Sequence, residues 1–164
     1  MTIRKADLND VETIQKLAFG IIPEYYADIV PHELNLFFVN TYQTAQAIQT
    51  QLSNGYDYYL LSDNGVMIGY LSIKINTEKS EMILSKLYLL KTYRGSGYGQ
   101  KVMGFIINQA TELNLAKISL LVNRNNQKAI RFYTKYDFAI TQELENKFEN
   151  GYTFLDYEMV RVNF

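Results

Sequence analysis

The 164-residue sequence predicts a mixed α/β fold in which about four helices flank a sheet of about seven strands. Three observations predict it. Apolar runs of strand length alternate with segments of helical period. Asp63-Asn64-Gly65 is a strong hairpin turn, and a glycine-rich loop joins an apolar run to a helical pattern. The expected order is β-α-α-β-β-β-α-β-α-β-β, and without a repeat or linker we expect a single domain over residues 1–164.

The strand predictions rest on short apolar and aromatic runs that are bounded by turn residues. Strands are expected at Thr2–Ala6, Tyr56–Leu61, Val66–Ile75, Ile83–Leu90, Ile118–Val122, Ala139–Glu143 and Tyr152–Val162. Gly69 lies inside the third of these strands, where a glycine often marks a β-bulge. Glu149-Asn150-Gly151 is expected to turn the chain between the last two strands.

The helix predictions rest on apolar residues that recur at helical spacing. The first helix carries Val11, Ile14, Leu17 and Ala18, and the third carries Val102, Met103 and Ile106. The second helix runs from Glu33 to Leu52 and ends before Asn54-Gly55, and the fourth runs from Gln127 to Tyr136. Between Pro23 and Pro31 we expect a helical turn or a loop.

Composition excludes several classes of function. With no cysteine and a single histidine, the chain has no disulfide, no thiol nucleophile and no His/Cys-rich metal site. No apolar run approaches the ~20 residues of a membrane span, and the N-terminus lacks the apolar region of a signal peptide. We therefore expect a cytoplasmic protein with no membrane partner. An isoelectric point near 5.9 and a short basic stripe argue against nucleic acid as a partner.

The segment Arg94-Gly95-Ser96-Gly97-Tyr98-Gly99 follows an expected strand and opens an expected helix. Such a loop holds phosphates, because backbone N–H groups point into it and the helix dipole favours negative charge. Spacing excludes two nucleotide loops: the dinucleotide fingerprint needs G-x-G-x-x-G, and the ATP-type loop needs Gly-Lys-Ser/Thr. The loop therefore predicts a different phosphorylated cofactor, with a turn that only caps a helix as the alternative.

Two motifs carry a resemblance to a known family. Arg94-x-x-Gly97-x-Gly99 resembles the acyl-CoA pyrophosphate loop of the GCN5-related N-acetyltransferases (GNAT family). Asn126-x-x-Ala129-x-x-Phe132-Tyr133, followed by Phe138, resembles the second motif of that family, in the family's order and spacing. Asp137 stands where the family has glycine, and aspartate tolerates the left-handed backbone conformation better than most residues.

The resemblance implies a GNAT-like sheet and acetyl-CoA as co-substrate. The implied cofactor-binding residues are Leu87, Tyr88, Leu89, Arg94, Gly95, Ser96, Gly97, Tyr98, Gly99, Gln100, Asn126 and Lys135. Among them, Leu87 and Leu89 would offer main-chain groups to the pantetheine arm. Tyr133 is implied as the catalytic acid that protonates the leaving thiolate, with simple packing as its alternative. No metal is implied.

The general base is left open. Many relatives place a glutamate near the start of the motif strand, where this chain has Ile83-Leu84-Ser85. The candidates are Glu81, His32, an acidic residue of the N-terminal half, or a chain of water molecules.

Uneven charge indicates the substrate class. Leu17–Ile73 contains no lysine or arginine, whereas Lys86–Lys135 contains nine basic residues and one acidic residue. The basic half fits coenzyme A, and the acidic half fits a small cationic amine. Glu24, Asp28 and Glu33 are the candidate substrate-binding residues.

The whole-chain pattern is similar to the PaiA-type spermine/spermidine acetyltransferases, which implies a polyamine-like substrate. The alternatives are a protein or peptide N-acetyltransferase and a non-catalytic acyl-CoA-binding regulator. The sequence does not fix the oligomeric state, and a homodimer is one option.

Overall fold

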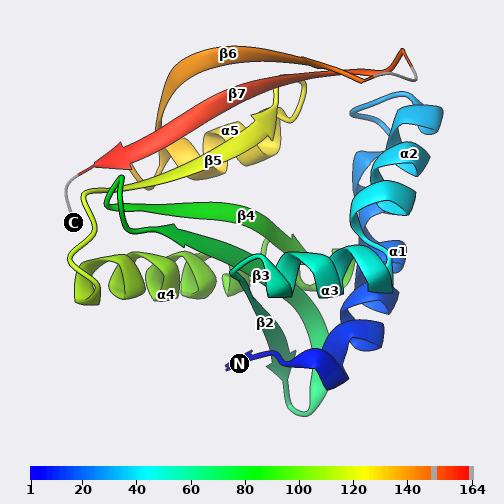
Figure 1. Ribbon diagram of the computed structural model, residues 1–164. Coiled ribbons are helices and arrows are strands. Elements are labelled where there is room, and N and C mark those ends of the chain that lie inside the picture. Colours follow the sequence, from blue (N-terminus) through cyan, green and yellow to red (C-terminus); the bar gives the residue numbers. More distant parts are fainter. Residues whose placement is uncertain (149–150, 163–164) are drawn as a thin grey trace. The chain divides into compact units, whose positions relative to one another are not determined.

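The computed structural model describes residues 1–148 and 151–162, and it confirms the mixed α/β class. The strands are β1 (Thr2–Lys5), β2 (Tyr56–Asp63), β3 (Val66–Asn76), β4 (Glu81–Leu89), β5 (Lys117–Asn123), β6 (Ala139–Lys147) and β7 (Thr153–Val162). The α-helices are α1 (Val11–Tyr26), α2 (His32–Tyr42), α3 (Ala45–Ser53), α4 (Tyr98–Glu112) and α5 (Gln127–Thr134). The seven strands form one hydrogen-bonded sheet in the order β1-β2-β3-β4-β5-β7-β6 (Figure 1).

The single helix expected from Glu33 to Leu52 is wrong, because the chain forms two helices there. α2 ends at Tyr42, and Thr44 begins α3 by accepting a hydrogen bond from the Ala47 amide at 3.2 Å. Gln15 of α1 also accepts a bond from the Ala45 amide at 2.5 Å. A threonine N-cap satisfies amide groups that a continuous helix would bond internally, so it favours a new start at this point.

Between Pro23 and Pro31, where a helical turn or a loop was expected, the chain continues α1 to Tyr26 and then forms a turn. Proline removes one amide donor from a helix interior. The Pro23 carbonyl accepts a hydrogen bond from the Asn35 side chain at 3.0 Å, so an α2 residue bonds to the backbone at this irregular position. Residues 29 and 30 donate backbone bonds to Tyr26, which ends the helix in a tight turn.

By contact, the chain divides into two compact units. The first unit comprises Met1–Lys74 and Ser85–Val102, and the second comprises Ile75–Leu84 and Met103–Phe164. Strands β1 and β2, helices α1 to α3 and all of β3 except its last two residues belong to the first unit, while β5 to β7 and α5 belong to the second. β4 and α4 contribute residues to both. The expectation of a single domain stays a prediction.

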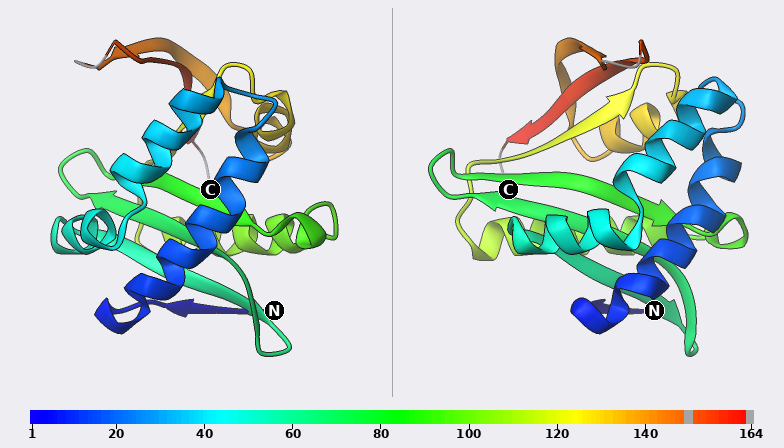
Figure 2. Two further views of the ribbon diagram at one scale, coloured as in Figure 1. Left: turned by 90° about the vertical axis from the view of Figure 1, so that its right-hand side faces the viewer. Right: turned by 45° about the vertical axis from the view of Figure 1, so that its right-hand side comes forward.

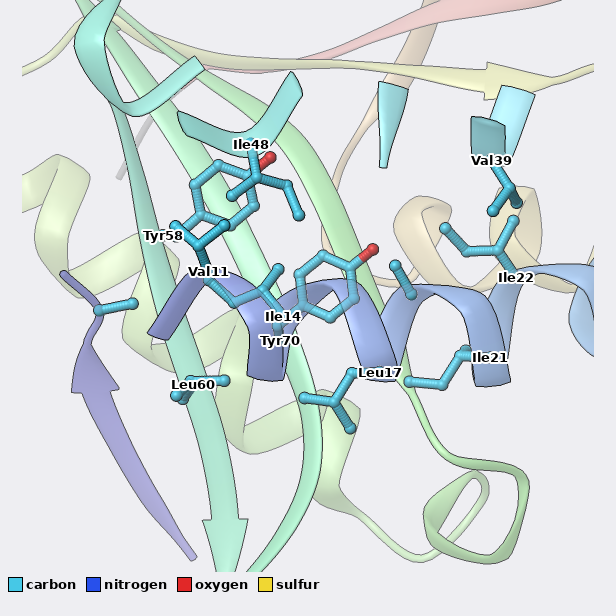
Figure 3. Close-up of a cluster of buried hydrophobic side chains, with 12 residues drawn as sticks. Val11, Ile14, Leu17, Ile21, Ile22, Val39, Ile48, Tyr58, Leu60 and Tyr70 are labelled. Carbon is cyan, nitrogen blue, oxygen red and sulfur yellow. The ribbon is translucent and has the colours of Figure 1, made fainter. Parts of the chain in front are cut away.

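The core of the first unit lies between α1 to α3 and one face of β2 and β3 (Figures 2 and 3). Ile14 and Ile22 of α1 are fully buried, and so are Tyr58 of β2 and Tyr70 of β3. The two tyrosine rings stack with their centroids 6.3 Å apart. The apolar stripe expected in the first helix is therefore the stripe that the core buries.

The core of the second unit lies on the apolar face of its strands. Ile118, Leu120 and Val122 alternate along β5 and are buried, as are Met159 of β7 and Phe138 just before β6. β5 pairs parallel with the first residues of β4 and antiparallel with β7, which in turn pairs antiparallel with β6. The hairpin expected at 149–151 includes residues 149 and 150, which lie outside the described part of the chain.

Two local predictions about the backbone are confirmed. Asn64 and Gly65 have φ angles of 48° and 80° at the β2–β3 turn, which a two-residue hairpin turn requires. The β2–β3 register shifts beside Gly69, from the pair Leu61–Gly69 to the pair Ser62–Met67, so β3 carries a bulge there.

Candidate active site

The glycine-rich loop has the geometry that its residue types predict. Gly95 and Gly97 have φ angles of 76° and 85°, which side chains other than glycine rarely adopt, and α4 begins directly afterwards at Tyr98. The first amide groups of a helix have no carbonyl one turn earlier to bond. The loop therefore presents backbone donors at the positive end of the α4 dipole, which is an arrangement suited to an anion such as a phosphate.

The side chain of Arg94 is held by other parts of the first unit. Its Nε donates to the Leu89 carbonyl at 2.8 Å, and its Nη2 donates to the Glu24 carboxylate at 2.7 Å. The guanidinium also lies 4.8 Å from the centre of the Tyr25 ring. Arg94 thus joins the end of β4 to α1, and a role in placing the loop has direct geometric support.

The same pair bears on Glu24 as a substrate-binding candidate. Hydrogen bonding to Arg94 is the main cause that lowers the pKa of Glu24, and Lys91 adds a second ion pair at 3.4 Å. Asp28 lies just beyond α1 and Glu33 lies in the first turn of α2, and both are exposed. Among the three predicted acidic residues, Glu24 is therefore already engaged with the loop.

Tyr98 and Gln100 begin α4, and the side chain of Tyr98 has a structural partner. Its hydroxyl donates to Asp63 at the β2–β3 turn at 2.8 Å, and this bond raises the pKa of Tyr98. Its ring packs edge-on against Tyr93, with centroids 5.5 Å apart. The side chain thus fixes the start of α4, while its main chain belongs to the loop.

Strand β4 supplies the segment expected to hold the pantetheine arm. Leu87, Tyr88 and Leu89 are all half-buried, and the Tyr88 ring lies 5.4 Å from Tyr70 in the core. The backbone of β3 comes very close to this segment at Gly69. The position of the Leu87–Leu89 main chain therefore depends on a glycine in the neighbouring strand.

Sequence reasoning missed Lys86, which is buried on β4 at 7% exposure. Its ammonium donates to Gln51 Oε1 at 2.5 Å, and it lies 5.3 Å from the centre of the Tyr58 ring. Burial lowers the pKa of Lys86 to about 8. The strand period of two could have indicated this burial, because it places Lys86 on the same face of β4 as Leu84 and Tyr88.

Asn126 is buried and caps α5. Its side-chain oxygen accepts a hydrogen bond from the Ala129 amide at 3.2 Å. The preceding turn is tightened by Asn123, whose side-chain oxygen accepts a bond from the Asn125 amide at 3.0 Å. The predicted N-cap chemistry is therefore present, and the contact of Asn126 with pantetheine stays a prediction.

Tyr133 lies near the end of α5 and is half-buried. Its ring contacts those of Phe132 and Phe138, with centroid distances of 5.4 and 5.7 Å. Lys135 follows as an exposed residue at the helix end.

Asp137 has a φ angle of 61°, which confirms the left-handed conformation expected at the position where the family has glycine. Arg161 of β7 holds the Asp137 carboxylate at 2.7 Å.

The structure distinguishes the candidates for the general base. Glu81 is buried at the amino end of β4 and forms an ion pair with Lys117 at 3.3 Å. His32 is the exposed first residue of α2. Asp156 of β7 was not among the candidates, yet its half-buried carboxyl group has a pKa that burial raises. Its sequence context, a strand with alternating polar residues, gave no signal of that burial.

The parallel pairing of β4 and β5 is short. Among the described residues it runs from Glu81–Lys117 to Leu84–Leu120, although β4 continues to Leu89 and β5 to Asn123. The backbone groups in the second half of each strand are therefore outside this ladder.

The described residues lack two further features. No group of three or more His, Cys, Asp or Glu side chains in residues 1–148 and 151–162 is arranged to hold a metal ion. None of the helices in the same residues has the length and apolar character needed to cross a membrane.

The fold and loop define a class of proteins: mixed α/β proteins with a glycine-rich loop between β4 and α4 and an Asn-capped helix after β5. The family model described as "Acetyltransferase (GNAT) family" matches residues 26–138, and the chain belongs to that family.

A relative of known sequence agrees with this membership. An uncharacterized N-acetyltransferase of Mycobacterium tuberculosis is 36% identical over 102 residues, which cover 60% of this chain and 62% of the relative. The match thus spans about three fifths of that relative's length.

Two solved structures share the fold. The PaiA N-acetyltransferase of Thermoplasma acidophilum, in complex with coenzyme A, has a TM-score of 0.78 at 19% identity, over 99% of this chain and 98% of that one. A mutant of the spermidine N-acetyltransferase SpeG of Vibrio cholerae has a TM-score of 0.72 at 20% identity, over 99% of this chain and 95% of that one.

Proposed function

We propose that this protein transfers an acetyl group from acetyl-CoA to a primary amine. The observation that carries the proposal is the loop at Gly95–Gly97, whose two left-handed glycines open α4 in a chain of the GNAT family. Its amide groups would bind the pyrophosphate of the cofactor. The Leu87–Leu89 main chain would bind the pantetheine arm, as the family resemblance implies.

The chemistry needs no covalent enzyme intermediate. A neutral amine attacks the thioester carbon, the N–C bond forms and the C–S bond breaks, so one group must accept a proton from nitrogen while another gives a proton to sulfur. Tyr133 is proposed as the donor to the thiolate. Its hydroxyl can give a proton, and its place in the second motif matches the family.

The proposed acceptor is a small cationic amine of the polyamine type. Support comes from the absence of basic residues in Leu17–Ile73 and from the exposed carboxylates of Asp28 and Glu33. The name of one protein with the same fold, spermidine N-acetyltransferase, agrees with this class. The alternatives are a peptide amine as acceptor and a regulator that binds acyl-CoA without turnover.

Free-thiol release from acetyl-CoA tests the proposal. The panel is spermidine, spermine, a small monoamine, an aminoglycoside and a generic peptide, with cofactor binding measured separately by calorimetry. Turnover with the polyamines alone supports the proposed acceptor. Turnover with the peptide alone refutes the polyamine part and keeps the transferase. Tight binding of acetyl-CoA without any turnover favours the regulator.

A further inference from the structure

Asp156 of β7 lies directly opposite Asn123, the last residue of β5. In open α/β sheets, ligands bind beyond the carboxyl ends of the parallel strands. Within the second unit, β5 is the strand that runs parallel to β4, so its carboxyl end is where a substrate is expected. We propose that Asp156 is the general base that accepts a proton from the substrate amine, an inference that rests on the proposed acetyl transfer.

Asp156 is also tied to the turn that positions α5. The Arg124 amide donates to the Leu155 carbonyl at 2.9 Å, which joins that turn to β7 one residue before Asp156. Asn126, at the end of the same turn, caps the helix that carries Tyr133. The segment Arg124–Asn126 thus connects the two proposed groups: Arg124 bonds to β7 beside Asp156, and Asn126 begins the helix that carries Tyr133.

The surroundings of Asp156 favour a carboxylate that accepts protons readily. Burial raises the pKa of Asp156, while a hydrogen bond with Asn146 of β6 and the charge of Arg124 oppose that rise. The Arg124 guanidinium also donates a hydrogen bond to Glu143 of β6 at 2.9 Å, so its positive charge is partly balanced by a second carboxylate. Glu158 is the other acidic residue on the same face of β7. A carboxylate with a higher pKa is a stronger base towards an ammonium group.

The other carboxylates considered for this role are held differently. Glu81 lies at the amino end of β4, opposite Lys117 at the amino end of β5, and it pairs with that lysine. Glu24 is paired with Arg94, and this contact lowers the pKa of Glu24, which weakens it as a base. Asp156 is therefore the carboxyl group that combines a raised pKa with a place at the carboxyl end of a strand.

The proton balance of the step is complete. The bound ammonium gives one proton to Asp156 and attacks as the free amine. The N–C bond forms, the C–S bond breaks, and Tyr133 gives its hydroxyl proton to sulfur. The second amine proton restores Tyr133, and Asp156 releases its proton to solvent, so that one proton is released in each turnover.

The test compares Asp156→Asn with the control Glu158→Gln in thiol release with spermidine between pH 6 and pH 10. Asparagine keeps the size of the side chain but cannot accept the proton. We expect kcat/KM of Asp156→Asn to fall about 10²–10⁴-fold at pH 7. The deficit should narrow as the pH approaches the pKa of a free alkyl amine, about 10, because the amine then needs no base. Glu158→Gln should keep the wild-type profile.

Thermal melting and calorimetric titration with coenzyme A separate catalysis from structure. Affinity for coenzyme A should be unchanged in Asp156→Asn, and the melting temperature should be unchanged or higher, since a neutral amide carries no cost of burying charge. A deficit that is constant across pH, a variant that matches wild type, or the same loss in Glu158→Gln would each overturn the assignment. If wild type turns over no amine of the panel, the proposed function itself fails, and this result is distinct from an active wild type with an equally active variant.

Discussion

Replacing Gly69 with alanine tests how the structure positions the Leu87–Leu89 main chain. A Cβ at this position would lie 2.1 Å from the Tyr88 carbonyl oxygen and 3.1 Å from the Leu89 Cα. Because carbon and oxygen normally approach to about 3.3 Å, the neighbouring strand would have to move by roughly 1.2 Å. The obstructing atom is main chain, so a change of rotamer cannot relieve the contact.

The cost follows from the size of that movement. Overpacking a well-packed site costs about 1–3 kcal/mol, and a backbone clash belongs at the upper end of this range. In a chain of 164 residues, about 3 kcal/mol lowers the melting temperature by roughly 6–12 °C. Affinity for coenzyme A should fall as well, if the main chain of β4 holds the pantetheine arm.

Differential scanning calorimetry and titration with coenzyme A measure both effects. Gly104→Ala is the matched control, because Gly104 lies inside α4 and nothing comes within 4 Å of its added Cβ. Alanine there should leave stability unchanged or raise it by up to ~1 kcal/mol. A Gly69→Ala protein that melts with wild type would refute the close approach of β3 to β4.

Three further predictions concern single side chains. Folding lowers the pKa of Lys86 from 10.5 to about 8, so the free energy of unfolding should rise by roughly 3 kcal/mol as the pH increases from about 8 to 10.5. Lys86→Met should abolish that rise in denaturant melts. An unchanged rise in the variant would contradict the assignment to Lys86. Tyr133→Phe should lower kcat about 10²–10⁴-fold without changing the melting temperature, whereas full activity would leave packing as its role. Asp137→Ala should cost about 1–2 kcal/mol in urea unfolding because of its left-handed backbone, and Asp137→Gly should cost less; equal losses would point instead to the ion pair with Arg161.

Local chemistry explains the parts of the fold that could be predicted. The turn at Asn64-Gly65, the loop at Gly95–Gly97 and the cap at Asn126 each depend on the conformational freedom or hydrogen bonding of a few adjacent residues. Short apolar and aromatic runs bounded by turn residues predicted a strand at each of the seven places, because such runs are local features of the sequence. The division between α2 and α3 was missed because the apolar spacing continues across Thr44, whereas the partner of Ala45 lies on α1.

The sequence by itself determined the family resemblance, the order of the strands along the chain and the glycine-rich loop, because each of these depends on a short run of residues. The tertiary structure alone decided that Arg94 is held by Glu24, 70 positions away, that Lys86 is buried against Gln51, and that Asp156 of β7 lies opposite the last residue of β5. The physical reason is that burial and charge pairing depend on neighbours distant in the chain, and these set both the pKa of a group and the direction of its side chain.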